Sequence, residues 1–189
     1  MRVQMAIAGL AAWALAALAP PMSAQAMTFE AVQVRHDGRP MQAVRARGPI
    51  EEGDAARFVR IAETLTTEPR VLVVESPGGN VRAAMALAEE IRARGYSVMV
   101  DGRCASACSS ILFPAGEYAV LRPGALLGFH SCHQAGFEHL TRRCNHAVAR
   151  LAAENGFPYA TLRHLMDPHG PREINWISRI TATCFGYYR

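Results

Sequence analysis

The chain has 189 residues, about half of them hydrophobic, which is enough for one globular domain with a sizeable core. Its formal net charge is +4, but the basic residues are spread among acidic ones, so we expect no nucleic-acid partner. All 20 basic residues are arginine, and a chain without lysine can use neither a Ser–Lys dyad nor a lysine Schiff base in catalysis.

The N-terminal segment has the pattern of a secretory signal peptide. Arg2 supplies a positive charge, residues 5–19 form an apolar stretch, and Ala24-Gln25-Ala26 matches the small-x-small cleavage pattern. The apolar stretch is short for a membrane span. We therefore expect residues 1–26 to be a cleaved signal peptide. Residues 27–189 would then form a single α/β domain that is periplasmic or secreted and has no stable membrane anchor.

Hydrophobic periodicity in the first half of the domain alternates between the spacing of strands and that of helices. It predicts, in chain order, strand 29–36, strand 41–47, helix 54–65, strand 70–75, helix 81–94 and strand 96–100. Asp54 and Asn80 are natural N-caps for the two helices, and Gly95 is the expected stop of the second. The strand at 70–75 is almost entirely apolar up to its end, which is typical of a buried strand in a parallel sheet.

The second half continues the alternation and ends in helices. The pattern predicts helix 103–113, strand 118–121, strand 125–130, helix 138–155, helix 159–166 and a short turn at 173–178. The first of these helices would carry Ser106 near its start. Alternating strands and helices indicate an α/β fold with a parallel core and right-handed crossovers.

Five cysteines in an exported chain favour disulfide bonds, and the odd number leaves at least one thiol free or bonded to another molecule. Cys132 and Cys144 flank a loop that contains a glycine and are the first choice for a bridge. Cys104 and Cys108 could bridge each other or pair elsewhere. Cys184 is the expected unpaired cysteine.

Three features that acyl transfer needs occur in order between residues 71 and 130. Gly78-Gly79 lies between a buried strand and a helix, where free backbone N–H groups could form an oxyanion hole. Ser106 has alanine on both sides, so its hydroxyl is uncrowded. His130 ends an apolar strand, and in a chain without lysine histidine is the base that remains for a serine nucleophile. We therefore expect Ser106 and His130 to form a nucleophile–base pair.

Four segments of this region resemble the ClpP/crotonase superfamily in their order and spacing. They are Gly48-Pro49-Ile50, Glu75-Ser76-Pro77-Gly78-Gly79, Cys104-Ala105-Ser106-Ala107-Cys108 and Gly128-Phe129-His130. The chain is most similar to exported ClpP-like proteins with a Cys-x-Ser-x-Cys motif. The resemblance covers residues 48–131 and implies a spiral of ββα units followed by a helical C-terminal tail.

The resemblance also implies a role for each matching residue. Ser106 would be the nucleophile and His130 the general base of an acyl-transfer reaction. The backbone N–H groups of Gly79 and Ala107 would form the oxyanion hole.

The third member of the triad stays open. The family's acid lies in the tail after the histidine, where this chain has no aspartate in register. Asp167 is the nearest aspartate upstream of that position. Asn175 could instead orient the imidazole without a charge, as in Cys–His–Asn sites. A dyad with no third residue is the remaining alternative.

These residues predict a periplasmic serine hydrolase, most simply a peptidase. Its substrate would be a peptide or protein, and it would need no cofactor. The family resemblance implies a homo-oligomer. Because Clp-type ATPases work on the side of the membrane that holds ATP, we expect no ATPase partner.

Other functions compete with this prediction. A binding or scaffold protein could keep the fold without turnover, and the open third position favours that alternative. A crotonase-like acyl-CoA enzyme is disfavoured because coenzyme A is not expected outside the cytoplasm. Cysteine and histidine side chains gather between residues 130 and 146, but their spacing matches no zinc module, so we expect no metal.

Overall fold

The computed structural model describes residues 26–36 and 38–187, so the predicted signal peptide, apart from Ala26, lies outside the described residues. The strands are β1 (Thr28–His36), β2 (Arg39–Arg47), β3 (Val71–Ser76), β4 (Ser97–Ala105), β5 (Ala119–Leu121), β6 (Leu126–Phe129) and β7 (Asn175–Ser178). The helices are α1 (Asp54–Ala62), α2 (Val81–Ala93), the π-helix η1 (Cys108–Leu112), α3 (Phe113–Ala115), the 3₁₀ helix η2 (Glu138–Leu140), α4 (Thr141–Glu154), α5 (Tyr159–Met166) and α6 (Arg179–Cys184).

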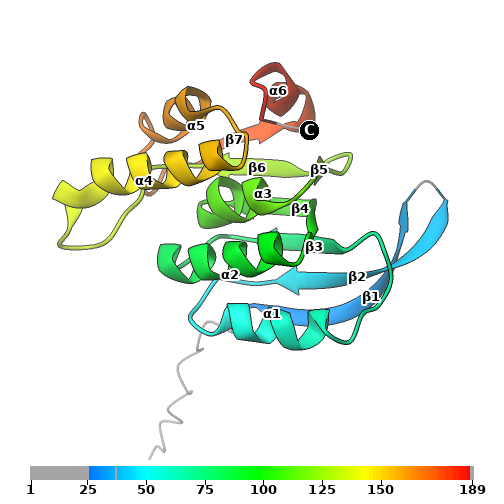
Figure 1. The fold of residues 1–189 in the computed structure, drawn as a ribbon. Coiled ribbons are helices and arrows are strands. Elements are labelled where there is room, and N and C mark those ends of the chain that lie inside the picture. The colour runs from blue at the N-terminus through cyan, green and yellow to red at the C-terminus, as the bar shows by residue number, and fades with distance from the viewer. Residues whose placement is uncertain (1–25, 37, 188–189) are drawn as a thin grey trace, which may run out of the picture.

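The strands form one mixed sheet in the order β1-β2-β3-β4-β6-β7, with β5 paired to β4 (Figure 1). β2, β3, β4 and β6 run parallel to one another, whereas β1 and β7 lie antiparallel at the two edges. The predicted α/β class and its parallel core are therefore confirmed.

The first half of the domain follows the sequence pattern closely. The side chain of Asn80 accepts the Ala83 N–H at 3.0 Å, which confirms it as the N-cap of α2. Gly95 adopts a left-handed φ of 65° just after that helix, as a C-terminal stop requires. Asp54 is not an N-cap, because it is the first residue of α1. Its buried carboxylate is instead paired with Arg57 at 2.7 Å.

β4 runs further than predicted and replaces the start of the helix expected at 103–113. Residues 103–105 continue the strand because they pair with β6 in parallel register, with Ala105 opposite Gly128. Cys104 also pairs with Ser76 of β3. Pairing on both sides outweighs the local preference of small residues for a helix. Ser106 therefore lies in the turn between a strand and a helical segment, not inside a helix.

The C-terminal part departs from the expected helices at one element. The short turn predicted at 173–178 contains β7, which pairs antiparallel with β6. Trp176 is partly exposed and Ile177 is buried, which is the alternation of an edge strand. A run of four residues is too short for its periodicity to distinguish a strand from a turn. The helices α4 and α5 are as predicted, except that the first turn of α4 is replaced by η2.

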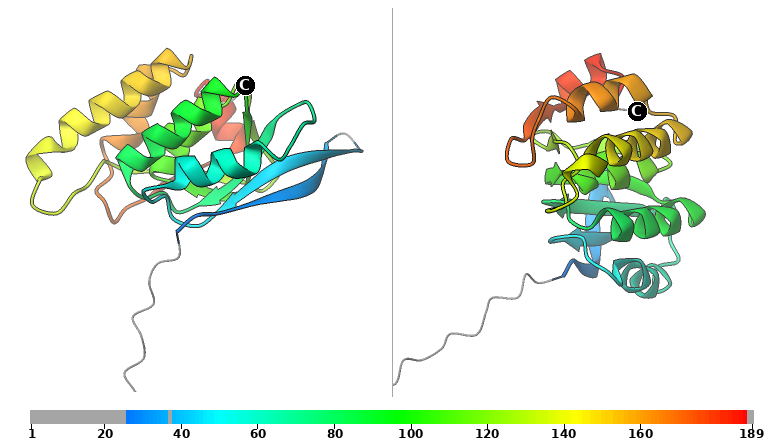
Figure 2. Two further views of the ribbon diagram at one scale, coloured as in Figure 1. Left: turned by 60° about the horizontal axis from the view of Figure 1, so that its bottom comes forward. Right: turned by 90° about the vertical axis from the view of Figure 1, so that its left-hand side faces the viewer.

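The main core lies between the sheet and the helices α1, α2 and α4 on one of its faces (Figure 2). A smaller apolar cluster of Ala43, Val71, Val73 and Met99 occupies the opposite face. Within the described residues, no helix combines the length and apolar character that crossing a membrane requires.

The end of the described chain is tied to the element that follows Ser106. Tyr187 is fully buried, and its ring packs against Phe113, Phe129 and Phe157. Its hydroxyl donates a hydrogen bond to the Ser109 carbonyl in η1 at 3.1 Å. The tail thus closes the core behind the Ser106 turn.

Candidate active site

The Ser106 turn has an unusual backbone conformation. Among the described residues, Ser106 is the one non-glycine residue with a positive φ, at 57°. A residue with a side chain is strained in this left-handed region and is retained there only when its surroundings hold it. The Cys104–Cys108 disulfide closes the turn on both sides, which confirms one of the two pairings considered for these cysteines.

Two serines that the sequence prediction overlooked also hold this turn. The Ser106 carbonyl oxygen lies 3.0 Å from the Ser109 hydroxyl and 2.7 Å from the Ser110 hydroxyl. The Ser109 hydroxyl also reaches the carbonyl oxygen of Gly128 in β6. Hydroxyl side chains three and four residues into a helical segment often bond back to its first carbonyl, and this spacing could have identified them.

The Gly78-Gly79 loop passes directly against the Ser106 turn. A Cβ atom on Gly78 would lie 2.6 Å from the Cβ of Ser106 and 3.0 Å from the backbone nitrogen of Ala107. This close approach, together with a φ of 92°, explains the glycine. On its other side the loop pairs with Ile50, whose N–H donates to the Gly78 carbonyl at 2.8 Å.

Both predicted oxyanion donors have suitable backbone positions. Gly79 and Ile50 form a parallel bridge in which the bonds to Ile50 come from the residues flanking Gly79. The Gly79 N–H therefore points away from Ile50. Ala107 opens the helical segment after Ser106, so its N–H has no acceptor within that segment.

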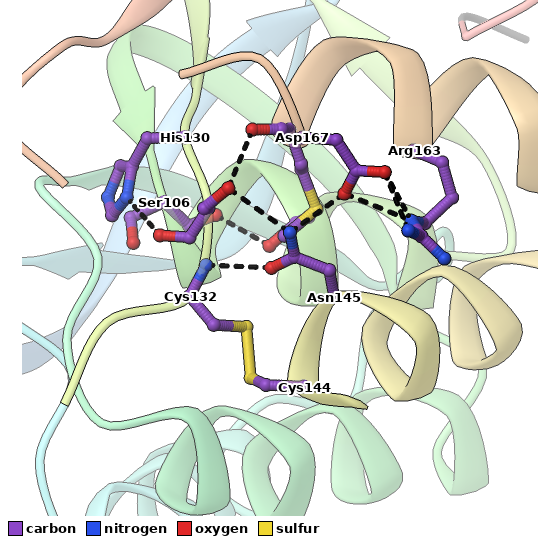
Figure 3. Close-up of a disulfide and its surroundings, with 10 residues drawn as sticks. Ser106, His130, Cys132, Cys144, Asn145, Arg163 and Asp167 are labelled. Carbon is purple, nitrogen blue, oxygen red and sulfur yellow. Dashed lines mark hydrogen bonds and ion pairs between the residues drawn. A yellow bond between two sulfur atoms is a disulfide. The ribbon is translucent and has the colours of Figure 1, made fainter. Parts of the chain in front are cut away.

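The sheet brings Ser106 and His130 together. The Ser106 N–H donates to the Gly128 carbonyl at 2.8 Å, and His130 follows Gly128 by two residues. In Figure 3 the imidazole and the serine side chain appear in the same part of the site. Across the described residues no hydrogen bond joins the Ser106 hydroxyl to His130, and an apo site often lacks a bond that forms once substrate is bound.

A backbone carbonyl fixes the tautomer of the His130 ring. Nδ1 of His130 lies 2.7 Å from the Ser131 carbonyl oxygen. A carbonyl oxygen can only accept a hydrogen bond, so Nδ1 carries the proton. In the neutral ring Nε2 is then unprotonated and free to accept a proton, which is the form that a general base needs.

Asp167 is not bonded to His130 in this structure. Its carboxylate pairs with Arg163 at 2.6 Å and accepts a hydrogen bond from the Asn145 side chain at 2.8 Å (Figure 3). Burial raises the pKa of Asp167, but the hydrogen bonds from Arg163 and Asn145 and the positive charge of Arg163 outweigh it and lower that pKa below its ordinary value. The Asp167 carboxylate is therefore ionised, and it is linked to the imidazole only through other residues.

Asn175 also makes no hydrogen bond to His130 within the part of the chain that the structure describes. It begins β7 and pairs with Phe129, the residue before His130. Neither candidate for the third position therefore contacts the imidazole among the described residues, and the ring is held by the backbone of Ser131.

The loop after His130 is tied to α4 by the second disulfide and by another residue that the sequence prediction missed. Cys132 and Cys144 are bonded and Cys184 is free and exposed, as predicted. Two disulfides are typical of an oxidising compartment. Asn145, beside Cys144, is buried and bonds to this loop, but a single asparagine in a helix gives no recognisable signal in the sequence.

A groove of about 740 Å³ adjoins Gly79. It runs between the start of α2 and the disulfide loop, and its apolar lining includes Val81, Met85, Phe137 and Leu140. Among the described residues no group of three or more histidine, cysteine, aspartate or glutamate side chains is arranged to hold a metal ion. No family model and no curated protein matches this sequence.

Proposed function

We propose that this protein is a serine hydrolase, most simply a peptidase, that acts by acyl transfer. The observation that carries the proposal is the strained Ser106 turn, which is bonded to β6, the strand directly before His130. Strain in a backbone is retained where surrounding contacts enforce it, and a serine held outward on such a turn is typical of a nucleophile.

The chemistry follows from the atoms at this turn. Nε2 of His130 takes the proton of the Ser106 hydroxyl as its oxygen attacks a substrate carbonyl. The N–H groups of Gly79 and Ala107 stabilise the negative charge that develops on the carbonyl oxygen. His130 then returns the proton to the leaving group, and water releases the acyl group from Ser106. The groove beside Gly79 would hold an apolar part of the substrate.

We also propose the ClpP/crotonase fold, periplasmic location and homo-oligomeric assembly that the resemblance implies. The parallel order of β2, β3 and β4, with α1 and α2 on one face, supports the fold. The two disulfides support an exported chain. The proposed substrate is a peptide or protein, and the reaction needs no cofactor.

A fluorophosphonate probe tests the hydrolase proposal, because it phosphonylates an activated serine far faster than an ordinary one. We expect a single adduct on Ser106 of the mature protein, located by mass spectrometry of its peptides. His130→Ala should slow labelling by about 10²-fold or more, because the general base is lost. His164→Ala, at an exposed histidine of α5 that does not line the groove, is the matched control and should label at the wild-type rate.

A second candidate function is a binding or scaffold protein without turnover. One observation favours it: no acidic side chain among the described residues contacts His130. Folded protein that does not react with the probe, or that reacts equally well after His130→Ala, would exclude the hydrolase and leave this candidate.

A further inference from the structure

Asn145 is a buried polar residue whose side chain bonds to the loop behind His130 and to Asp167 at the end of α5. It is 2% exposed. Its Oδ1 accepts the Cys132 N–H at 2.8 Å, and its Nδ2 donates to the Ser131 hydroxyl at 3.1 Å and to Asp167 at 2.8 Å. The orientation of the amide is fixed by its partners, since an N–H must face the oxygen and a carboxylate must face the NH₂ group.

The bond to Cys132 controls the carbonyl that holds His130. The Ser131 carbonyl and the Cys132 N–H belong to one planar, trans peptide unit, so they point in opposite directions. When Asn145 accepts the N–H on one side, the carbonyl oxygen is directed to the other side, where Nδ1 of His130 donates to it. The orientation of this single peptide unit thus links Asn145 to the imidazole (Figure 3).

The contacts around the peptide unit prevent it from rotating. The Ser131 N–H donates to the His169 carbonyl at 2.9 Å, and the Ser131 hydroxyl donates to the Met166 carbonyl at 3.0 Å. The Cys132–Cys144 disulfide joins the residues next to Ser131 and Asn145. The C-terminal end of α5, His169 just beyond it and the start of α4 therefore hold the same two residues of the loop.

We propose that Asn145 is a positioning residue, which keeps His130 protonated on Nδ1 by fixing the Ser131–Cys132 peptide. Asp167 and Arg163 hold the amide of Asn145 in the required orientation. A charged group thus acts on the imidazole through an amide and a backbone carbonyl instead of contacting it. The catalytic consequence rests on the proposed hydrolase function, whereas the tautomer of His130 does not.

Nitrogen-15 NMR of the imidazole rings tests the proposal without turnover. The mature protein with both disulfides formed is labelled at histidine, and the His130 signals are assigned with His130→Gln. When the ring is neutral, wild-type His130 should carry its proton on Nδ1. Asn145→Ala should shift it to a mixture of the two tautomers. Val148→Ala, a buried residue three positions further along α4 with no bond to the loop, should keep the wild-type tautomer.

Two more variants keep the test decisive if Asn145→Ala fails to fold. Asp167→Ala alters a side chain that is 39% exposed, and it should shift the tautomer in the same direction by a smaller amount. The exchange Asn145→Asp with Asp167→Asn keeps an acceptor for the Cys132 N–H and an amide–carboxylate bond between the two positions, so the wild-type tautomer should return. A His130 tautomer that is unchanged in both alanine variants overturns the proposal.

Labelling by the fluorophosphonate probe provides the second readout. Asn145→Ala should slow the labelling of Ser106 by about tenfold or more. His130→Ala, which removes the base itself, should slow it further. If wild-type protein does not label at all while the tautomer responds to Asn145→Ala, the hydrolase proposal fails and the positioning role stands. Labelling that is as fast in Asn145→Ala as in Val148→Ala counts against the positioning role.

Discussion

The Ser106 turn and the His130 loop are both held firmly, but by contacts of different range. Ser106 is fixed by its own strand pairing, by Ser109 and Ser110, and by a disulfide that spans four residues. The loop after His130 has no regular secondary structure. Its contacts reach residues 12 to 38 positions away, on α4, on α5 and just beyond α5.

This difference predicts which half of the site tolerates the loss of a contact. The Ser106 turn is supported several times over by near neighbours and by the sheet, so losing one contact leaves the others in place. The His130 loop depends on a few distant residues that must all be folded to act. We therefore expect changes in the loop contacts to move the base more readily than comparable changes move the nucleophile.

The largest effect is expected where the Ser106 turn touches the glycine loop. In Gly78→Ala the new methyl group would meet the Ala105 carbonyl oxygen and the Ser106 Cβ, each at 2.6 Å, in a backbone with a φ of 92°. Crowding and strain together should lower the free energy of unfolding by about 3 kcal/mol and abolish the labelling of Ser106. Urea denaturation and probe labelling measure the two effects.

Gly124→Ala is the control for backbone strain alone. Gly124 has a similar φ of 84°, but no atom lies within 4 Å of the position that its methyl group would take. Its substitution should cost about 1 kcal/mol and leave labelling unchanged. If the two variants lose the same stability and label equally fast, the close approach of the glycine loop to Ser106 is not important for either property.

The two disulfides provide a direct comparison of the Ser106 turn with the His130 loop. Loss of a disulfide lowers stability more when the loop that it closes is longer. Replacing Cys132 and Cys144 by alanine opens a sequence separation of 12 and should cost about 3 kcal/mol, against about 2 kcal/mol for Cys104 and Cys108 at a separation of 4. Urea denaturation of the two double variants gives both values.

Labelling rates of the same two variants show which half of the site each bridge supports. We expect slower labelling without Cys132–Cys144, because Asn145 then alone joins the loop to the start of α4. Without Cys104–Cys108 the strand pairing and the two serine hydroxyls still hold Ser106, so labelling should change less. A larger loss of labelling in the second variant would reverse the comparison.

The same contrast explains what could be predicted from the sequence. Local patterns revealed the elements from β1 to α2, and the motifs at the ends of β4 and β6 predicted Ser106 and His130 as a pair. The extra length of β4 and the presence of β7 come from pairing with β6, and no local pattern encodes that pairing.

The contacts of Asn145 lie further still from what sequence patterns can reveal. Asn145 meets Ser131 and Asp167 across 14 and 22 residues, and neither separation is a helical or strand period. Asp167 was a candidate because it is acidic and close in sequence to the family's position. Its actual partners, Arg163 and Asn145, depend on how α4 packs against α5.

The smallest expected effect concerns the anchor at the far end of this network. The pKa of Asp167 is lower in the folded protein than its ordinary value of 3.8, because the contacts with Arg163 and Asn145 outweigh the opposing effect of burial. A depressed pKa means that Asp167 stabilises the fold above pH 3.8 and loses that contribution as the pH falls through its folded pKa.

Urea denaturation at pH 7, 5 and 3 should show the free energies of unfolding of wild type and Asp167→Asn converging at the acidic end. Arg163→Gln should also lower the free energy of unfolding at pH 7. It should make that free energy less dependent on pH in the same acidic range, because the guanidinium is the strongest partner of the carboxylate. A difference between wild type and Asp167→Asn that stays constant down to pH 3 would show that the carboxylate charge is not what anchors Asn145, and the link from Asp167 to the His130 loop would then depend on hydrogen-bond geometry alone.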